Sequence, residues 1–191
     1  MHWLIPQLRS FAERHPCIHV QVRTVDGDID PTAPVDVFIR REASELRGLP
    51  SQVFLTERSI LVSSPSFMPA FTQRSSSDML WLTKVPRIGA RSRPDLWPHW
   101  NEFHGLEAKA IEPTLEFDNT VLAIQAAVQG LGACVVPEGF VTAMLGSGTL
   151  RLLHAARIET GSYSFAVGRR RDSARVATFT AWLSDVSAAS Y

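Results

Sequence analysis

The sequence of 191 residues contains only two cysteines, Cys17 and Cys134, which lie far apart in the chain. Without the close spacing of a disulfide scaffold, they predict two free thiols in a reducing compartment. An excess of charge is also lacking, because 19 basic residues balance 19 acidic ones and the formal net charge is zero. Nucleic-acid-binding domains usually carry a basic excess, so we do not expect these residues to bind DNA by themselves.

Long apolar runs are absent as well. No run approaches the roughly 20 residues that cross a bilayer, and Met1 leads into an amphipathic pattern instead of a signal peptide. These absences favour a cytoplasmic protein without membrane contact. What the chain does contain is 45% hydrophobic residues, enough for the core of one domain or of two small lobes.

The most readable stretch is residues 115–137, which predicts a strand, a helix and a second strand. Asp118 or Asn119 can cap the helix, since either side-chain oxygen can accept a first-turn N–H. Gly130 is suited to end the helix, because glycine readily takes a positive φ. Residues 133–136 form a short apolar run, typical of a strand that is buried on both faces. Pro137 then ends that strand and opens a further helix.

This pattern is a unit of a doubly wound α/β sheet. In such sheets, ligands bind outside the carboxyl ends of the strands, near helix N-termini. The turn at residues 117–120 is therefore the first place at which we expect a small molecule.

Other elements follow from hydrophobic periodicity. Helical spacing predicts helices at residues 2–14 and 138–145 and a last helix that Asp172 or Ser173 caps, and a short helix is expected at 67–71. Residues 75–78 have the composition of a loop that leads into a helix cap. Alternating or continuous apolar residues predict strands at 18–22, 35–39, 52–55, 58–63, 85–90, 114–117, 149–153 and 163–167.

The order of several segments adds a family resemblance. The stretch FDNTVLAIQAAVQGLGACVVPEGFV, followed by LGSGTL, resembles the second half of the effector-binding domain of LysR-type transcriptional regulators. Further segments match in order and spacing, namely HWLIPQLRSFAERHPCIHVQV near the start, VDVFIRR and ERSILVSSPSF in the middle, and YSFAVGRR and FTAWL at the end. Each motif alone is weak, but the ordered set is fairly specific and covers nearly the whole chain. Residues 96–103 also resemble the tryptophan-rich helix of this family, with Pro98 in its first turn.

The resemblance implies a fold of two doubly wound α/β lobes with an interlobe cleft, similar to periplasmic binding proteins. Lobe I would comprise residues 1–64 and 166–191, and lobe II residues 65–165, with Pro65 as a stiff hinge. In the family a further strand precedes the first helix, so the first strand of lobe I is expected to be missing here. The N-terminal helix-turn-helix domain is expected to be missing too, as in a truncated regulator or one whose start was chosen too far downstream.

The implied function is effector sensing and oligomerisation in a bacterial regulator, without catalysis and without a cofactor. A small molecule would bind in the cleft, the chain would form a homodimer or homotetramer, and DNA would be bound only by the missing helix-turn-helix domain. The family pairs the helices expected here at residues 2–14 and 119–129 between antiparallel subunits. The alternative is a solute-binding protein of a transporter, which shares the two-lobed architecture but would need an export signal. A third possibility, an enzyme with two α/β lobes, lacks a recognisable catalytic constellation.

The predicted effector site combines residues from both lobes. Arg40 ends an apolar strand of lobe I, although a surface salt bridge with Glu42 or Glu45 is an equally good interpretation of it. Two helix starts and a cationic Arg40 favour an anion, such as a small carboxylate. The complete predicted set is Arg40, Ser64, Phe117, Asp118, Asn119 and Thr120.

Other patterns have simpler interpretations than a site. Glu112, Glu116 and Asp118 resemble paired catalytic carboxylates, but no histidine or serine forms a nucleophile motif beside them. His15, Cys17 and His19 alternate, but a structural zinc site needs four ligands. The glycine pairs at 130/132 and 146/148 follow helices, so they are helix ends and not phosphate loops. The basic cluster at 169–171 with Arg175 is short, and we interpret it as a solvated face or a subunit contact.

Overall fold

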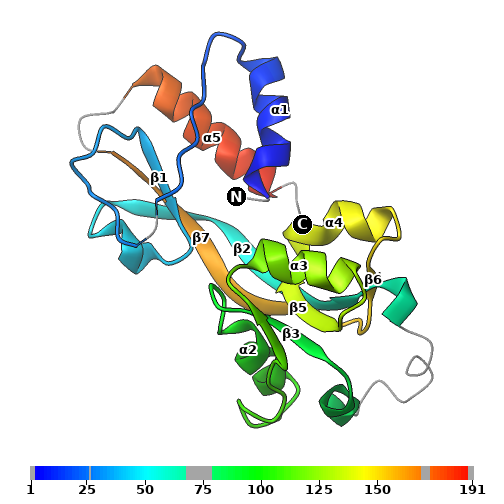
Figure 1. The fold of residues 1–191 in the computed structure, drawn as a ribbon. Helices are drawn as coiled ribbons and strands as arrows, with labels where there is room; N and C mark the ends of the chain where they lie inside the picture. The colour runs from blue at the N-terminus through cyan, green and yellow to red at the C-terminus, as the bar shows by residue number, and fades with distance from the viewer. Residues whose placement is uncertain (1–2, 26, 68–78, 169–172, 189–191) are drawn as a thin grey trace. The chain divides into compact units, whose positions relative to one another are not determined.

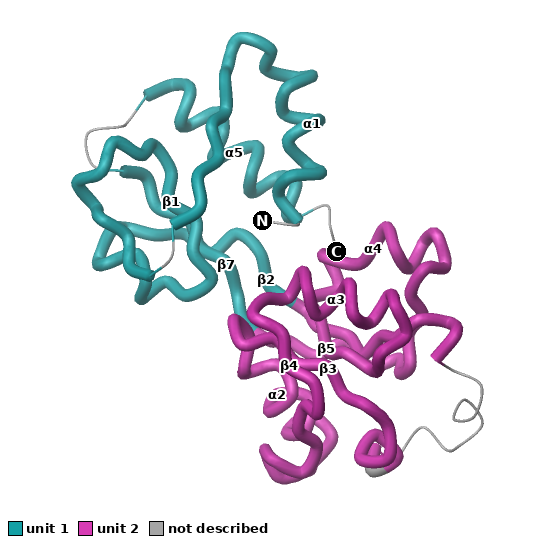
Figure 2. The backbone as a smooth tube through the Cα atoms, viewed as in Figure 1, with its two compact units in different colours: residues 1–57, 161–191 teal, residues 58–160 magenta. Residues whose placement is uncertain are grey.

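The computed structural model describes residues 3–25, 27–67, 79–168 and 173–188 (Figure 1). The chain divides into two compact units (Figure 2). Unit 1 comprises Met1–Glu57 and Gly161–Tyr191, and unit 2 comprises Arg58–Thr160. Two neighbouring strands, β2 (Ser51–Ser63) and β7 (Ile158–Val167), belong partly to each unit. The unit bounds fall a few residues before the expected lobe boundaries at 64/65 and 165/166, and the division into functional lobes stays a prediction.

Unit 2 is built on a mixed sheet. At its centre lies β3 (Arg87–Ala90), which runs parallel to β4 (Leu115–Phe117) on one side and to β5 (Ala133–Pro137) on the other. The strand β2 is antiparallel to β5 and also pairs with the short β6 (Arg151–Leu152). The predicted strand–helix–strand unit is confirmed as β4–α3–β5. Its two strands are not neighbours, because β3 lies between β4 and β5 in the sheet.

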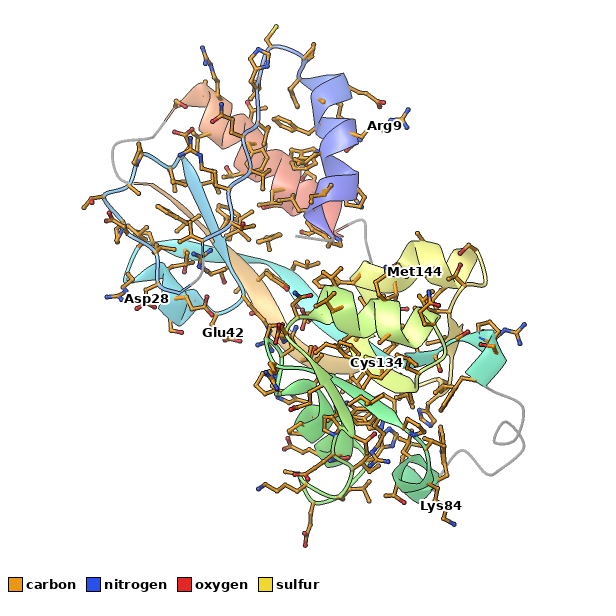
Figure 3. All side chains as sticks on the ribbon, in the orientation of Figure 1. Arg9, Asp28, Glu42, Lys84, Cys134 and Met144 are labelled. Carbon is orange, nitrogen blue, oxygen red and sulfur yellow. The ribbon has the colours of Figure 1, made fainter. Side chains whose placement is uncertain are left out.

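Both faces of this sheet are covered, as the apolar run in β5 predicts. Along β5, Cys134 and Val136 pack against α3 and α4, while Ala133 and Val135 pack against α2 on the opposite face. Successive side chains of a strand point to opposite faces, so one short apolar strand serves two cores. Figure 3 labels Cys134, which belongs to the core between the sheet and the helices α3 and α4.

The helices of unit 2 lie close to their predicted positions. They are α2 (Leu96–Phe103), α3 (Thr120–Val128) and α4 (Glu138–Gly146), with 3-10 turns η2 (Pro65–Phe67) and η3 (Met79–Lys84). Pro98 lies in the first turn of α2, where its missing N–H costs no helical hydrogen bond. In the middle of α2, Trp100 is fully buried, and the amide of Asn101 donates to the carbonyl oxygens of Ala108 (2.7 Å) and Ile111 (3.0 Å).

Unit 1 contains α1 (Leu4–Arg14), β1 (Val37–Arg40), η1 (Ala43–Leu46) and α5 (Ala174–Ala188). β1 is antiparallel to β7, with Val37 opposite Val167. Its largest core is aromatic: the ring centroid of Phe11 lies 4.9 Å from that of Trp182 and 5.3 Å from that of Phe179. Ser173, one of the two predicted caps, directly precedes α5, and its hydroxyl accepts the N–H of Val176 at 3.3 Å.

One predicted strand of unit 1 is wrong. Residues 18–22 have no strand pairing, and the side chains of Val20 and Val22 are 40% and 43% exposed. Alternation of apolar residues produces a strand only where a neighbour supplies N–H and C=O groups in register. Among the described residues, β1 pairs with β7 and not with this segment.

Other differences concern the ends of elements. The two strands expected at 52–55 and 58–63 are one continuous strand, β2, and the strand expected at 163–167 begins earlier, at Ile158. The strand expected at 149–153 shortens to β6. The helix expected at 67–71, the loop at 75–78, the cap Asp172 and the cluster at 169–171 lie wholly or mainly outside the described residues. Within the described part of the chain, no helix is long and apolar enough to cross a membrane.

Candidate functional site

The carboxyl ends of β3 and β4 form one edge of unit 2. The backbone N–H of Arg91 donates to the carbonyl of Phe117 (2.8 Å), and that of Ser92 donates to the carbonyl of Asp118 (3.1 Å). These hydrogen bonds join the turns that follow the two parallel strands. The edge is the kind of position at which doubly wound sheets bind ligands.

The helix α3 begins at this edge, and Asn119 is its cap. The side-chain oxygen of Asn119 accepts the N–H of Leu122 at 3.1 Å. Asp118, the other predicted cap, points to solvent with 80% of its side chain exposed, and its carboxylate lies 3.6 Å from the guanidinium of Arg91. Because the cap occupies only one N–H, the first turn of α3 keeps further N–H groups and its positive dipole end for another acceptor.

Four of the predicted site residues therefore come together at the start of α3. Thr120 is buried as the first residue of the helix, and Phe117 is half-buried against the core below it. Asp118 and Asn119 are exposed beside them. This turn presents a hydroxyl, an aromatic ring and helix N–H groups within four consecutive positions.

Ser64 does not join this cluster. Its hydroxyl bonds to that of Ser66 at 2.8 Å, close to Gly130, which follows the C-terminus of α3. The nine residues of α3 separate this position from Thr120 by about 13 Å. The reason is strand direction: β2 is antiparallel to β5, so β2 ends at the amino end of β5 and away from the carboxyl edge.

Arg40 has several partners inside unit 1. Its guanidinium lies 3.6 Å from Glu45 and donates to the carbonyl oxygens of Ile39 (3.1 Å), Val25 (3.4 Å) and Gly27 (3.5 Å). Its side chain is 19% exposed. The predicted salt bridge with Glu45 is therefore present. Through its hydrogen bonds to Val25 and Gly27, Arg40 also holds the loop that precedes β1. Its role toward a ligand stays a prediction.

Sequence reasoning missed a buried charged group in unit 1. Glu57, on β2, is only 4% exposed; its carboxylate accepts the hydroxyl of Tyr163 at 3.1 Å and lies 3.7 Å from Nε of Arg41. Gly161, at a φ of 141°, packs against the same guanidinium, so a Cβ there would lie 2.9 Å from a nitrogen of Arg41. No local pattern marks Glu57, because its neighbours on β2, Thr56 and Arg58, are polar as well.

The patterns that suggested other chemistry do not assemble into sites. Glu112, Glu116 and Asp118 are all exposed. In the part of the chain that the structure describes, no three histidine, cysteine or acidic side chains are grouped so that they could hold a metal ion. Gly130 has a φ of 77° and ends α3, as predicted. Gly132 allows a close approach, because a Cβ there would lie 2.5 Å from the carbonyl oxygen of Pro86.

Comparisons with known proteins agree with this architecture. The activator AmpR of Pseudomonas aeruginosa is 28% identical over 189 residues, which are 97% of this chain and 62% of AmpR. The regulator TrpI of the same organism is 31% identical over 150 residues, 78% of this chain and 50% of TrpI. Both are transcriptional regulators, neither enzymes nor transporter proteins, and the chain spans half to two thirds of their length.

Solved structures show the same fold. The effector domain of AmpR from Pseudomonas aeruginosa superimposes with a TM-score of 0.80 at 26% identity, covering 99% of this chain and 90% of that domain. The AmpR effector-binding domain from Citrobacter freundii gives 0.76 at 25% identity, covering 97% and 92%. The family model described as the LysR substrate binding domain matches residues 1–188. The chain therefore belongs to the LysR substrate-binding domain family, with the mixed α/β fold of LysR effector-binding domains.

Proposed function

We propose that this chain senses a small molecule for a bacterial LysR-type transcriptional regulator and contributes to its oligomerisation. The observation that carries the proposal is the start of α3, where helix N–H groups, Thr120 and Phe117 lie at the carboxyl edge of a doubly wound sheet. The family match over residues 1–188 supports it. Helix N–H groups, a hydroxyl and an aromatic ring can bind a ligand, so we propose a binding function and not catalysis at this edge.

The ligand that this edge favours is a small anion. The positive end of the helix dipole and the free N–H groups at a helix start attract a carboxylate. Arg91 adds a cation beside this turn. The carboxylate of Asp118 opposes this attraction, but its ion pair with Arg91 and its exposure weaken the opposition. A carboxylate held by Thr120 and the first-turn amides satisfies these groups best.

Regulation would follow from unequal affinity. A ligand shifts a protein between two arrangements only by as much as it binds one arrangement better than the other. The bound arrangement would be transmitted through a homodimer or homotetramer in the cytoplasm, and DNA would be bound by a helix-turn-helix domain outside these residues.

The proposed site can be tested with acetate, succinate and benzoate as carboxylate probes. We expect at least one of them to raise the melting temperature, and Thr120→Val to weaken its binding by about three- to tenfold, since one neutral hydrogen bond is lost. Thr142→Val, on α4, is the matched control, because that hydroxyl donates to the Glu138 carbonyl of its own helix. Equal binding by the Thr120→Val variant would place the ligand elsewhere.

The predicted contribution of Arg40 needs a separate test. Arg40→Ala should weaken a carboxylate probe by about 1.5–3 kcal/mol if a charge-assisted hydrogen bond is lost. Since Arg40 also binds Glu45 and the preceding loop, the melting temperature without ligand must be compared first. Glu45→Gln removes the ion pair but keeps the guanidinium, and it should leave probe affinity unchanged. If both variants lose affinity equally, Arg40 acts only by holding its loop.

The proposed oligomer rests on exposed apolar side chains of two helices. Ile5 on α1 is 59% exposed, and Val121 and Leu122 on α3 are 39% and 46% exposed. Exposed apolar residues on helices that the family pairs between subunits favour a dimer contact. Light scattering should give the mass of a dimer for the native chain and of a monomer for Leu122→Glu. A control, Leu152→Glu on β6, should stay dimeric, and a monomeric native chain would contradict this pairing.

A further inference from the structure

Unit 2 has a pocket of about 520 Å³ that none of the residues at the start of α3 lines. Its volume lies within the roughly 300–1,000 Å³ of small-molecule sites. His99, Glu102 and Phe103 contribute to it from α2, which packs on the opposite face of the sheet from α3 (Figure 1). The pocket is thus separate from the proposed effector site.

The lining carries charges of both signs. Arg58 and Arg157 supply two cations, and Glu102 and Glu159 supply two carboxylates. Arg157 directly precedes β7 and Glu159 lies on it; both are exposed while Ile158 between them is buried, because side chains along an extended chain alternate between its faces. The start of β7 therefore brings a guanidinium and a carboxylate to the same pocket.

These charged groups keep capacity for a ligand. Arg157 contacts Glu138 through Nε, at 2.9 Å and 3.1 Å from the two carboxylate oxygens, which leaves the two Nη groups of its fork. Within the described part of the chain, the carboxylates of Glu102 and Glu159 have no hydrogen-bond or ion-pair partner. The Nη groups of Arg157 and the carboxylates of Glu102 and Glu159 thus line the same pocket.

An aromatic wall completes the pocket. Phe103 is 58% exposed at the C-terminus of α2, so its ring is open to contact with an apolar group of a ligand. We propose that the pocket binds a small zwitterion with an apolar side chain, an amino acid or a short peptide. Its carboxylate pairs with the Arg157 fork, its ammonium with Glu102 and Glu159, and its side chain covers Phe103.

The test uses the whole chain and three probes in an amide NMR titration: L-phenylalanine, 3-phenylpropionate without the ammonium, and 2-phenylethylamine without the carboxylate. We expect L-phenylalanine to shift the amides of His99, Phe103 and Glu159, and each singly charged probe to bind about tenfold more weakly. Phe103→Ser and Glu159→Gln should each weaken L-phenylalanine binding by about fivefold or more.

Two matched variants serve as controls. Leu131→Ser removes another exposed apolar side chain, 48% exposed, and Glu107→Gln removes another exposed carboxylate; neither residue lines the pocket. Both should bind L-phenylalanine as the native chain does. Equal affinity for all three probes, or shifts confined to residues 117–120, would overturn the proposal. The second outcome would leave the effector site at α3 intact, so the two proposals fail separately.

Discussion

Unit 2 and unit 1 differ in how their strands are paired and buried. In unit 2, β5 has β2 on one side and β3 on the other, and helices cover both of its faces. In unit 1, β1 has only β7 as a partner in the described residues, and residues 18–25 have no strand pairing. Unit 1 relies instead on aromatic packing between α1 and α5 and on the buried group around Glu57.

This difference indicates where each unit is sensitive. A sheet covered on both faces depends on the close packing of its cores, so loss of volume is costly there. A unit with a short sheet and a buried charge depends on a few polar contacts, whose loss leaves an uncompensated charge.

The largest effect is expected from Trp100→Ala in unit 2. Trp100 is fully buried between α2 and the sheet, so its removal should lower the free energy of unfolding by about 3–5 kcal/mol. Urea denaturation followed by amide NMR signals of β5 and α5 would show which unit unfolds first. Phe103→Ala, at an exposed position of the same helix, is the control and should cost far less. Comparable losses for both variants would contradict the description of this core.

In unit 1 the largest effect is expected from Glu57→Gln. The buried carboxylate faces Arg41 and Tyr163, so neutralising it should lower the free energy of unfolding by about 3 kcal/mol. Glu42→Gln is the control: Glu42 lies 3.5 Å from the same guanidinium but is 52% exposed, and surface pairs contribute only about 0–1 kcal/mol. Urea midpoints of the two variants should differ clearly, and equal midpoints would refute a special role for burial here.

A smaller, pH-dependent effect is expected in unit 2. Burial, and then the neighbouring His154 at 4.9 Å between ring centroids, lower the pKa of His104. The unfolded chain thus takes up a proton at His104 more readily than the folded chain does. The free energy of unfolding is therefore highest above about pH 6.5 and decreases as the pH falls below that value. Urea midpoints at pH 7 and pH 5 should differ less in His104→Gln than in the native chain. His19→Gln, an exposed imidazole of unit 1, should keep the native difference.

The two cysteines give a contrast in reactivity without a large change in stability. Cys17 is exposed in unit 1, whereas burial in unit 2 raises the pKa of Cys134 to about 12. Since the thiolate is the reactive form, iodoacetamide at pH 8 should label one thiol in the native chain and both in urea. Mass spectrometry would read the result. Labelling of native Cys134, or an intramolecular disulfide, would contradict the burial of this strand.

Much of unit 2 could be predicted from sequence because its signals are local. The helix start at Asn119, the stop at Gly130 and the doubly buried strand 133–137 each depend on residues within one or two turns of each other. The choice between Asp118 and Asn119 as cap was open, because both residue types can accept the same N–H. In the structure Asn119 accepts the N–H of Leu122, while Asp118 is exposed beside Arg91.

The sequence could not place residues whose neighbours are distant in the chain. Alternation at 18–22 predicted a strand, but strand formation needs a partner whose position no local pattern gives. Ser64 was grouped with the start of α3, although the antiparallel pairing of β2 with β5 puts it at the other end of that helix. The network of Glu57 joins residues over 100 positions apart, so no spacing could reveal it.

The sequence by itself thus determined the β4–α3–β5 unit, a helix cap at either Asp118 or Asn119, the glycine stop and the α/β class, because backbone preferences and hydrophobic periodicity act over a few residues. Tertiary structure alone decided that β3 lies between β4 and β5, that Arg40 binds Glu45, and that Glu57 is buried. The physical reason is that pairing and burial depend on which distant segments meet, and the same local pattern is compatible with several such partners.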